Sequence, residues 1–482
     1  MTSHHSRRWW ILALLSLAQL MVVLDTTVVN IALPSAQHAL QFSNDQRQWI
    51  VTAYALAFGS LLLLGGRLAD LFGRKLTLVV GLLGFSVVSA IGGAAGSFQM
   101  LVAARTLQGV FGALLAPAAL SLLTTTFRDP AERGKAFGIY GAIAGSGAAV
   151  GLLLGGVLTE YLSWRWCLYV NLALAIPAVT GAMLLLRNER AAAGPRLDLP
   201  GTLTACLGLF ALVYGFSNAQ THGWGAGLTI GMFVGAVVML ASFVLVQQRA
   251  EHPLLPLRVV ADRARGGSYL AMGIAGIGMF GVFLFLTYYM QQTLGFSPIQ
   301  SGLAFLPMTA VIVLSATAST AALLPRLGPR PLVTLGMALA AVGMVLLTRI
   351  GVHTAYASHV LPSLLVMGVG LGLVFAPGMS TATLGVAPGD AGVASALVNT
   401  MQQVGGSLGT ALLSTLAATA TSSYVAGRLP SQSVLAAASV HGYTVAFWVS
   451  AGIFGLGAML SALLLPRGVV EVDPSAEPAL AH

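Results

Sequence analysis

Asp25 lies inside a long apolar run, where an acid could carry proton chemistry. Val22, Val28 and Val29 share its helical face, so a helix over this run would withdraw the carboxyl group from water. A carboxylate at the centre of a bilayer costs about 2.5 to 3.5 kcal/mol, and burial disfavours its charged form. Such an acid can gain and lose a proton near physiological pH, as a proton-coupled carrier requires. The alternative is a structural carboxylate that bonds a neighbouring helix.

A basic residue inside a later apolar run, Arg105, is the complementary candidate. Arg105, Gln108 and Gly109 follow helical spacing, so they share one face of a helix. A guanidinium stays charged inside a membrane and must therefore face a partner or water. Arg105 could hold Asp25 in its ionised form, or it could reach backbone carbonyls of the first run. A purely structural role is the alternative.

A stripe of amides predicts one wall of a wet cavity. Asn399, Gln402 and Gln403 recur at helical spacing in a late apolar run. Hydrogen bonding between helices is the alternative interpretation. Further polar and aromatic side chains could contact a substrate, although aromatic residues near span ends also anchor helices at the membrane interface. The cavity candidates are Tyr54, Gln108, Tyr140, Asn171, Tyr288, Tyr289, Gln291, Gln292, Asn399, Gln402 and Gln403.

Glycines at four-residue spacing mark a close contact between helices. Gly147, Gly151 and Gly155 lie on one stripe, and Gly156 follows them. Small residues let two helix backbones approach closely. We expect either a static packing seam or a seam that alternates between two packings.

The composition identifies a membrane protein. Hydrophobic residues make up 57% of the 482 residues and charged residues only 8%, whereas soluble domains carry about 25% charged residues. So few charges cannot cover a surface that faces water, which excludes a soluble enzyme, a disordered protein and a free nucleic-acid binder. The two cysteines lie in apolar runs and form neither a disulfide framework nor a zinc pattern.

Two patterns typical of soluble enzymes occur, at 276–281 and 405–409. Both need a strand, a turn and a helix in that order, and both lie inside apolar helical runs, so we reject them. The sequence contains no His-Glu-x-x-His pair and no Walker loop. We therefore expect no enzyme activity, cofactor, catalytic residue or metal site. Uphill transport would then draw on an ion gradient or on a partner.

Long apolar runs predict an all-α integral membrane protein. A bilayer core about 30 Å thick needs about 20 residues of apolar helix. The first run is too long for a cleaved signal peptide and contains an acid. The division at 220–225 and the break near Gly389 decide the number of spans. The fourteen predicted spans are 10–33, 47–66, 76–96, 99–123, 136–158, 164–187, 200–220, 225–247, 268–292, 299–322, 332–351, 358–380, 392–418 and 441–465.

The basic residues predict the orientation, because they favour cytoplasmic loops. With the N-terminus inside, most of the 23 basic residues fall in inside segments. The outside segments hold only Arg47, Arg165, Arg349 and Arg428. We therefore expect both termini in the cytoplasm and a disordered acidic tail at 467–482. Only Lys75 and Lys135 are lysines, and this arginine bias is typical of a high-GC bacterial source.

The chain resembles the major facilitator superfamily over nearly its whole length, specifically the fourteen-span drug:proton antiporters of bacteria. After the second span, Gly66, Asp70, Gly73 and Arg74 resemble the cytoplasmic signature of that family. In the signature an Asp and a following Arg latch two helices in one state of the cycle. Leu71 stands where a basic residue usually follows the Asp.

Further motifs follow in the family's order. The segment 24–34 is similar to the first-span motif, whose acid is taken to be a proton site, and 105–109 resembles a motif linked to proton transfer. The glycine stripe resembles the antiporter motif, with Leu152 in place of its usual proline. The amide stripe at 399–406 also resembles a family pattern, and the loop 327–330 looks like a second copy of the cytoplasmic signature.

The resemblance implies two six-helix bundles with a pseudo-two-fold relation, at 1–190 and 266–466, and an inserted helix pair within 191–265. It implies a monomeric, proton-driven exporter in the bacterial inner membrane that works by alternating access. Its partners would be protons, the lipid bilayer and amphipathic, lipophilic, often cationic molecules. One membrane carboxylate favours a monocation or a neutral molecule over a dication. The alternatives are a dedicated exporter of one endogenous metabolite or antibiotic and a non-transporting receptor or scaffold.

Overall fold

A computed structural model describes residues 2–42, 44–127, 129–187, 198–251, 253–387, 390–429 and 431–469. All regular elements in these residues are helices, which confirms the all-α class. Most of the predicted tail, 470–482, lies outside the described residues, as do Arg128 and Gly389. The disorder expected for the tail therefore stays a prediction.

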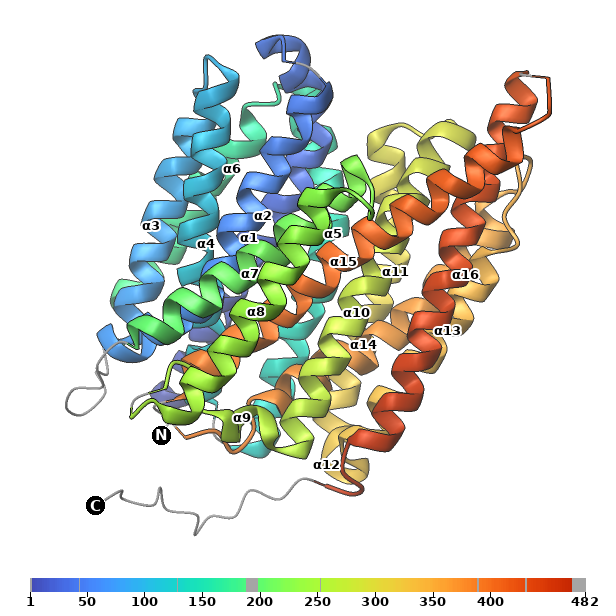
Figure 1. Ribbon diagram of the computed structural model, residues 1–482. Helices are drawn as coiled ribbons and strands as arrows, with labels where there is room; N and C mark the ends of the chain where they lie inside the picture. The colour runs from blue at the N-terminus through green and yellow to red at the C-terminus, as the bar shows by residue number, and fades with distance from the viewer. Residues whose placement is uncertain are drawn as a thin grey trace.

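The first half of the molecule is a bundle of six long helices (Figure 1). They are α1 (Thr2–Leu40), α2 (Asn44–Phe72), α3 (Arg74–Gly93), α4 (Phe98–Thr126), α5 (Pro130–Tyr161) and α6 (Trp166–Leu185). α2 and α3 pack against α4, α1 packs against α4, α5 and α6, and α3 packs against α6. α1 continues through Pro34 to Leu40, beyond the predicted end of the first span at residue 33.

The second half repeats this arrangement. Its long helices are α10 (Arg263–Tyr288), α11 (Pro298–Ala318), α13 (Pro329–Leu347), α14 (Leu361–Ala382), α15 (Ala391–Val425) and α16 (Gln432–Leu464). Shorter elements join or extend them, namely α9 (Leu257–Ala261), α12 (Leu324–Leu327) and the π-helical turns η1 (Tyr289–Thr293), η2 (Ser319–Leu323) and η3 (Tyr356–Val360). α11 and α13 pack against α14, α10 packs against α14, α15 and α16, and α13 packs against α16. The two halves thus have the same neighbours, helix for helix.

Contacts between the halves follow the same symmetry. α2 packs against α15 as α11 packs against α5, and α4 packs against α15 as α14 packs against α5. The predicted pseudo-two-fold relation of two six-helix bundles is therefore confirmed. The residue boundaries predicted for the two bundles stay predictions.

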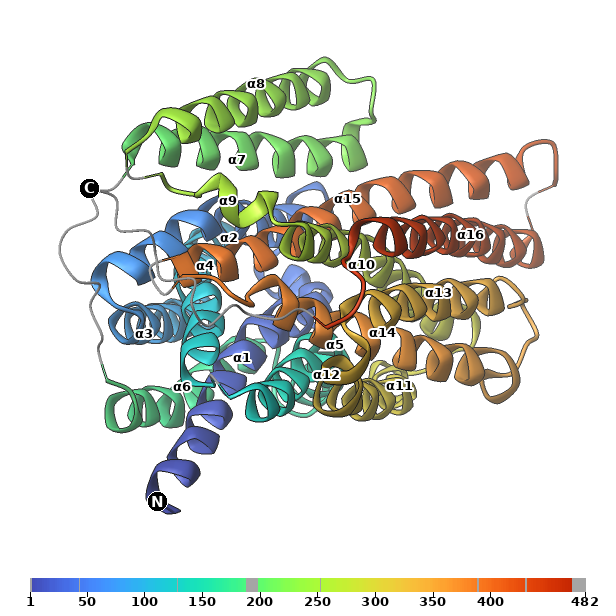
Figure 2. The ribbon, with the colours of Figure 1, turned by 90° about the horizontal axis from the view of Figure 1, so that it is seen from below.

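The inserted pair is α7 (Leu199–His222) and α8 (Gly227–Arg249). The predicted division at 220–225 is confirmed, since Gly223 has a φ of +87°, which glycine adopts without a steric penalty, and ends α7. α7 packs against α2 and α15, and Figure 2 shows the pair along one side of the bundle. In α8 only 17% of the apolar segment is buried, as expected of a helix that faces lipid.

Twelve helices in the described residues are long and apolar enough to cross a membrane. α5 and α15 are absent from that group, although they contain 32 and 35 residues. α15 carries the amide stripe and many hydroxyl side chains, which lower its hydropathy. Figure 1 shows both helices lying among the other spans. The predicted number of fourteen spans is consistent with this architecture and stays a prediction.

The two ends of the bundle differ in charge. α1 begins and α16 ends at the bottom of Figure 1. This end, here called the basic end, carries Arg7, Arg74, Arg187, Arg249, Arg263 and Arg330 at or beside the ends of their helices. It is the end that the charge pattern predicts to lie in the cytoplasm.

Candidate functional site

Asp25 of α1 is the centre of a polar network buried in the first half. The residue is 0% exposed, and its Oδ2 lies 2.5 Å from Nη1 of Arg105 on α4. Gln108, one turn further along α4, donates from Nε2 to Oδ1 at 3.0 Å. Asn171 of α6 donates from Nδ2 to the same oxygen at 2.9 Å. Three donors thus converge on one carboxyl group, which is the arrangement expected for a carboxylate anion.

Ser89 of α3 extends the network to a fourth helix. Its hydroxyl oxygen accepts from Gln108 at 2.8 Å and from Asn171 at 2.9 Å. The hydroxyl donates to the Leu168 carbonyl at 3.0 Å. The predicted contact between Asp25 and Arg105 therefore lies inside a cluster that ties α1, α3, α4 and α6 together. Sequence reasoning missed Ser89, because a single serine in an apolar run has no distinguishing pattern.

Arg105 has partners besides Asp25. Its guanidinium lies 4.4 Å from the ring centroid of Tyr54 on α2. It also donates to Gln108 Oε1 at 3.0 Å and to the Ile50 carbonyl at 3.4 Å. These contacts can keep the guanidinium in place when the carboxyl group leaves it.

The predicted cavity residues occupy several environments. Gln108 is 0% exposed and its amide is engaged in the Asp25 network. Tyr54 is buried and stacks on Phe58. Tyr140 of α5 is buried and donates to Gln19 of α1 at 2.9 Å. Tyr288, by contrast, is 41% exposed.

The amide stripe of α15 lies next to both halves. Asn399 donates to the Ser395 carbonyl of its own helix at 3.0 Å. Gln402 contacts the Met272 sulfur of α10 at 3.7 Å. Gln403 is half-buried and packs against Gly59 of α2. Gln291 is half-buried in η1. Gln403 thus stands where the second half meets the helix that carries Tyr54, while Gln402 contacts a helix of its own half.

The glycine stripe of α5 lies against the helix that carries Asp25. A Cβ atom added to Gly147 would lie 2.8 Å from Val23 Cγ1, and one added to Gly155 would lie 3.1 Å from the Val28 Cα. A Cβ atom on Gly151 would overlap the hydroxyl of Thr27. Gly156, next along the chain, is also buried. The stripe therefore sets the distance between α1 and α5.

We expect Gly151→Ala to lower thermal stability, because its methyl group pushes α1 away from α5. Overpacking of this kind costs about 1 to 3 kcal/mol. Gly231→Ala on α8 is the matched control, since a Cβ atom there has no neighbour within 4 Å. The measurement is the unfolding temperature of the purified variants in detergent. Equal shifts in the two variants would show that the seam places no constraint on α1.

Asp70 joins the two halves at the basic end. Its Oδ1 lies 3.3 Å from Nη2 of Arg74. Both carboxylate oxygens accept from the backbone N–H of Gly392, at 3.1 Å each. Gly392 lies in the first turn of α15, where unpaired N–H groups attract negative charge. The sequence predicted the pair of Asp70 and Arg74. It did not predict that the start of α15 would bind Asp70.

Two glycines of the signature have structural roles around Asp70. A Cβ atom on Gly66 would lie 2.5 Å from the Gly392 carbonyl oxygen, so only glycine allows α2 and α15 to come this close. Gly73 has a φ of +97° and makes the turn between α2 and α3. Both residues therefore help to place Asp70 against α15.

A second contact closes the basic end between α5 and α14. Arg133 donates to the Ser380 carbonyl at 3.2 Å and to the Thr383 hydroxyl at 2.9 Å. Arg133 precedes the predicted span 136–158, and burial lowers the pKa of its guanidinium to about 10, so it remains charged at neutral pH. Sequence reasoning counted Arg133 only as an inside loop charge.

Two equivalent helical bundles, with ionisable groups buried in one and contacts that join them at one end, define a membrane transporter. A family model described as the Major Facilitator Superfamily matches residues 15–410. The chain belongs to this superfamily.

Known proteins agree with this assignment. The puromycin resistance protein pur8 of Streptomyces alboniger is 53% identical over 469 residues, which cover 97% of this chain and 93% of the relative. The cephamycin export protein CmcT of Amycolatopsis lactamdurans is 40% identical over 430 residues, 87% of each chain. The solved structure of the human organic anion transporter MFSD10 (TETRAN) has a TM-score of 0.63 at 16% identity, and the match covers 94% of this chain and 99% of that one. At that identity the last comparison supports the fold alone.

Proposed function

We propose that this protein is a proton-coupled exporter of amphipathic, lipophilic compounds that works by alternating access. Membership of the superfamily and the roles named for its relatives, antibiotic resistance and export, support the direction of transport. The observation that carries the proton coupling is the fully buried ion pair of Asp25 and Arg105.

In the proposed cycle, Asp25 alternates between two partners, Arg105 and a proton. When a proton binds, the carboxyl group becomes neutral and its attraction to the guanidinium falls. Arg105 then keeps its contacts with the Tyr54 ring, Gln108 and the Ile50 carbonyl. α1 is thereby released from α4, and the change in its packing against α5 can be passed to the rest of the bundle.

The contacts at the basic end belong to the state that is closed to the cytoplasm. Opening this end requires Asp70 to leave the Gly392 N–H and Arg133 to leave Ser380 and Thr383. Proton binding at Asp25 and opening of the basic end would be alternate steps. The basic residues at that end support an orientation in which both termini lie in the cytoplasm of a bacterial cell.

The substrate site is proposed to lie between the halves, where Gln403 of α15 approaches α2. The one membrane carboxylate that the sequence predicts, Asp25, favours a monocation or a neutral molecule as the substrate. A dedicated exporter of one antibiotic is the second candidate, because the names of both relatives contain a single antibiotic. We propose a monomer without cofactor or enzyme activity.

Purified protein in liposomes tests this function. An imposed pH gradient should drive transport of a lipophilic cation, and a pH-sensitive dye should report proton movement in the opposite direction. An ionophore that collapses the gradient should stop both. A panel of several unrelated cations and puromycin separates a multidrug carrier from a dedicated one. Absence of flux for every compound would support a non-transporting protein instead.

A further inference from the structure

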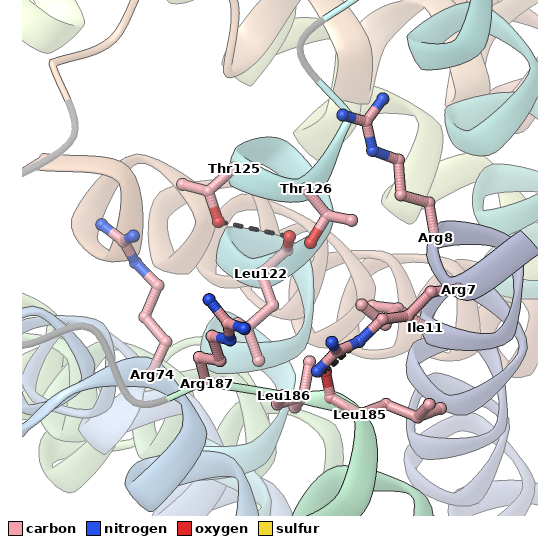
Figure 3. A pocket seen from close by; sticks show the side chains of 10 residues that line it. All are labelled: Arg7, Arg8, Ile11, Arg74, Leu122, Thr125, Thr126, Leu185, Leu186 and Arg187. Atoms are coloured by element: carbon pink, nitrogen blue, oxygen red, sulfur yellow. Dashed lines mark hydrogen bonds between the residues drawn. The ribbon is translucent and has the colours of Figure 1, made fainter. Parts of the chain in front are cut away.

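We propose that the first half holds the phosphate headgroup of an anionic phospholipid in a pocket at the basic end, apart from the transport pathway. The pocket has a volume of about 240 Å³ and lies among the starts of α1 and α3 and the ends of α4 and α6. Figure 3 shows Arg74 and Arg187 on one side of the last turn of α4, and Arg7 and Arg8 on the other side. Thr125 and Thr126 lie between them.

The charges around the pocket are not balanced by its described residues. Four arginines line it, and no acid is among the lining residues. Arg8 pairs with Glu132 at 3.0 Å, and Arg74 pairs with Asp70 at 3.3 Å. Neither of these two acids lines the pocket.

The other two arginines carry the excess charge. Arg7 donates to the Leu185 carbonyl at 2.8 Å, and none of the described acids pairs with its charge. Within the part of the chain that the structure describes, Arg187 has no hydrogen bond or ion pair. A phosphate group supplies acceptor oxygens and negative charge in the geometry that guanidinium groups prefer.

The position of the pocket favours a lipid over a free anion. The candidate spans Arg7–Val29 and Arg74–Gly93 begin at the pocket, and Phe98–Thr126 and Trp166–Leu185 end there. The pocket therefore lies at the depth where the chain leaves the hydrocarbon, which is the depth of lipid phosphates.

Apolar side chains near the pocket offer a surface for acyl chains. On α6, Met183 is 59% exposed and Leu184 is 74% exposed, and Trp10 on α1 is 67% exposed. A free phosphate would make no use of these groups. Basic pockets between spans on the cytoplasmic side are known to bind acidic headgroups.

The site is also connected to the contact between the halves. Arg74 lines the pocket and pairs with Asp70, which bonds the start of α15. A phosphate in the pocket and the carboxylate of Asp70 therefore share one guanidinium.

The test measures binding of short-chain phosphatidylglycerol to the detergent-purified full chain by thermal unfolding and native mass spectrometry. Phosphatidylcholine of the same chain length and inorganic phosphate are the comparison ligands. Arg187→Gln removes one lining charge outside the helices and should weaken phosphatidylglycerol binding about fivefold, the effect of one cation near a lipid surface. Arg249→Gln is the matched control, since this arginine is exposed at the end of α8 on the opposite side of the bundle (Figure 2).

Preference for phosphatidylglycerol over phosphatidylcholine, lost in Arg187→Gln and kept in Arg249→Gln, supports the proposal. Equal binding of the two lipids, or an equal loss in the two variants, overturns it. If inorganic phosphate protects the protein as well as phosphatidylglycerol does, the pocket is a site for free anions and the assignment to a lipid is wrong.

Discussion

Replacing Asp25 by Asn should reduce gradient-driven efflux to the level of empty liposomes while the protein remains folded. Asn keeps an oxygen that can accept from Gln108 and Asn171, so these two contacts can persist and the protein can still fold. Asn cannot take up a proton, so residue 25 can no longer alternate between Arg105 and a proton. Because the proposed coupling depends on this alternation, coupling should be lost. Efflux and dye-reported proton movement should be lost together.

Glu160→Gln is the control for this experiment. Glu160 is an exposed acid at the end of α5, outside the network, and its replacement should leave transport at the native level. Circular dichroism and size-exclusion chromatography show whether each variant is folded. Full gradient-driven efflux in a folded Asp25→Asn variant would remove Asp25 from the mechanism.

Removing both charges of the buried pair should be less harmful to stability than removing only one. Loss of one partner from a buried ion pair costs about 3 to 5 kcal/mol, because the remaining charge is left without compensation. Asp25→Asn leaves the charge of Arg105 in this position. In the double variant Asp25→Asn, Arg105→Gln, neither charge remains.

A double-mutant cycle on the free energy of unfolding measures this effect. We expect a coupling energy larger than the loss caused by Arg105→Gln alone, and therefore above the usual range of about 0.5 to 3 kcal/mol. The double variant should be more stable than Asp25→Asn alone and should still fail to transport. Additive effects of the two single changes would mean that the pair contributes no mutual stabilisation.

The sequence predicted most of the fold, because a membrane span needs a long apolar run and the runs are separated by short polar breaks. The division between α7 and α8 at Gly223 followed from such a break. Helix ends were harder to place. α1 continues to Leu40, α15 to Val425, and α16 begins at Gln432, since a helix can extend beyond the apolar run that marks it.

The sequence predicted the two charges of the candidate site better than their surroundings. Asp25 and Arg105 stood out because a charge inside an apolar run is costly. Asn171 was predicted only as a cavity residue, and Ser89 was not predicted at all, since amide and hydroxyl groups are common in spans. The Gly392 N–H that binds Asp70 lies 322 residues away, and spacing within a helix contains no information about such partners.

The position of the inserted pair has a consequence for how compounds reach the interior. The halves meet along two equivalent seams, α2 with α15 and α5 with α11. α7 lies over the first seam. A compound dissolved in the bilayer would find this side screened, so sideways entry is restricted to the α5–α11 face. The protein would thus have one entrance for membrane-dissolved compounds, although its two bundles are symmetric.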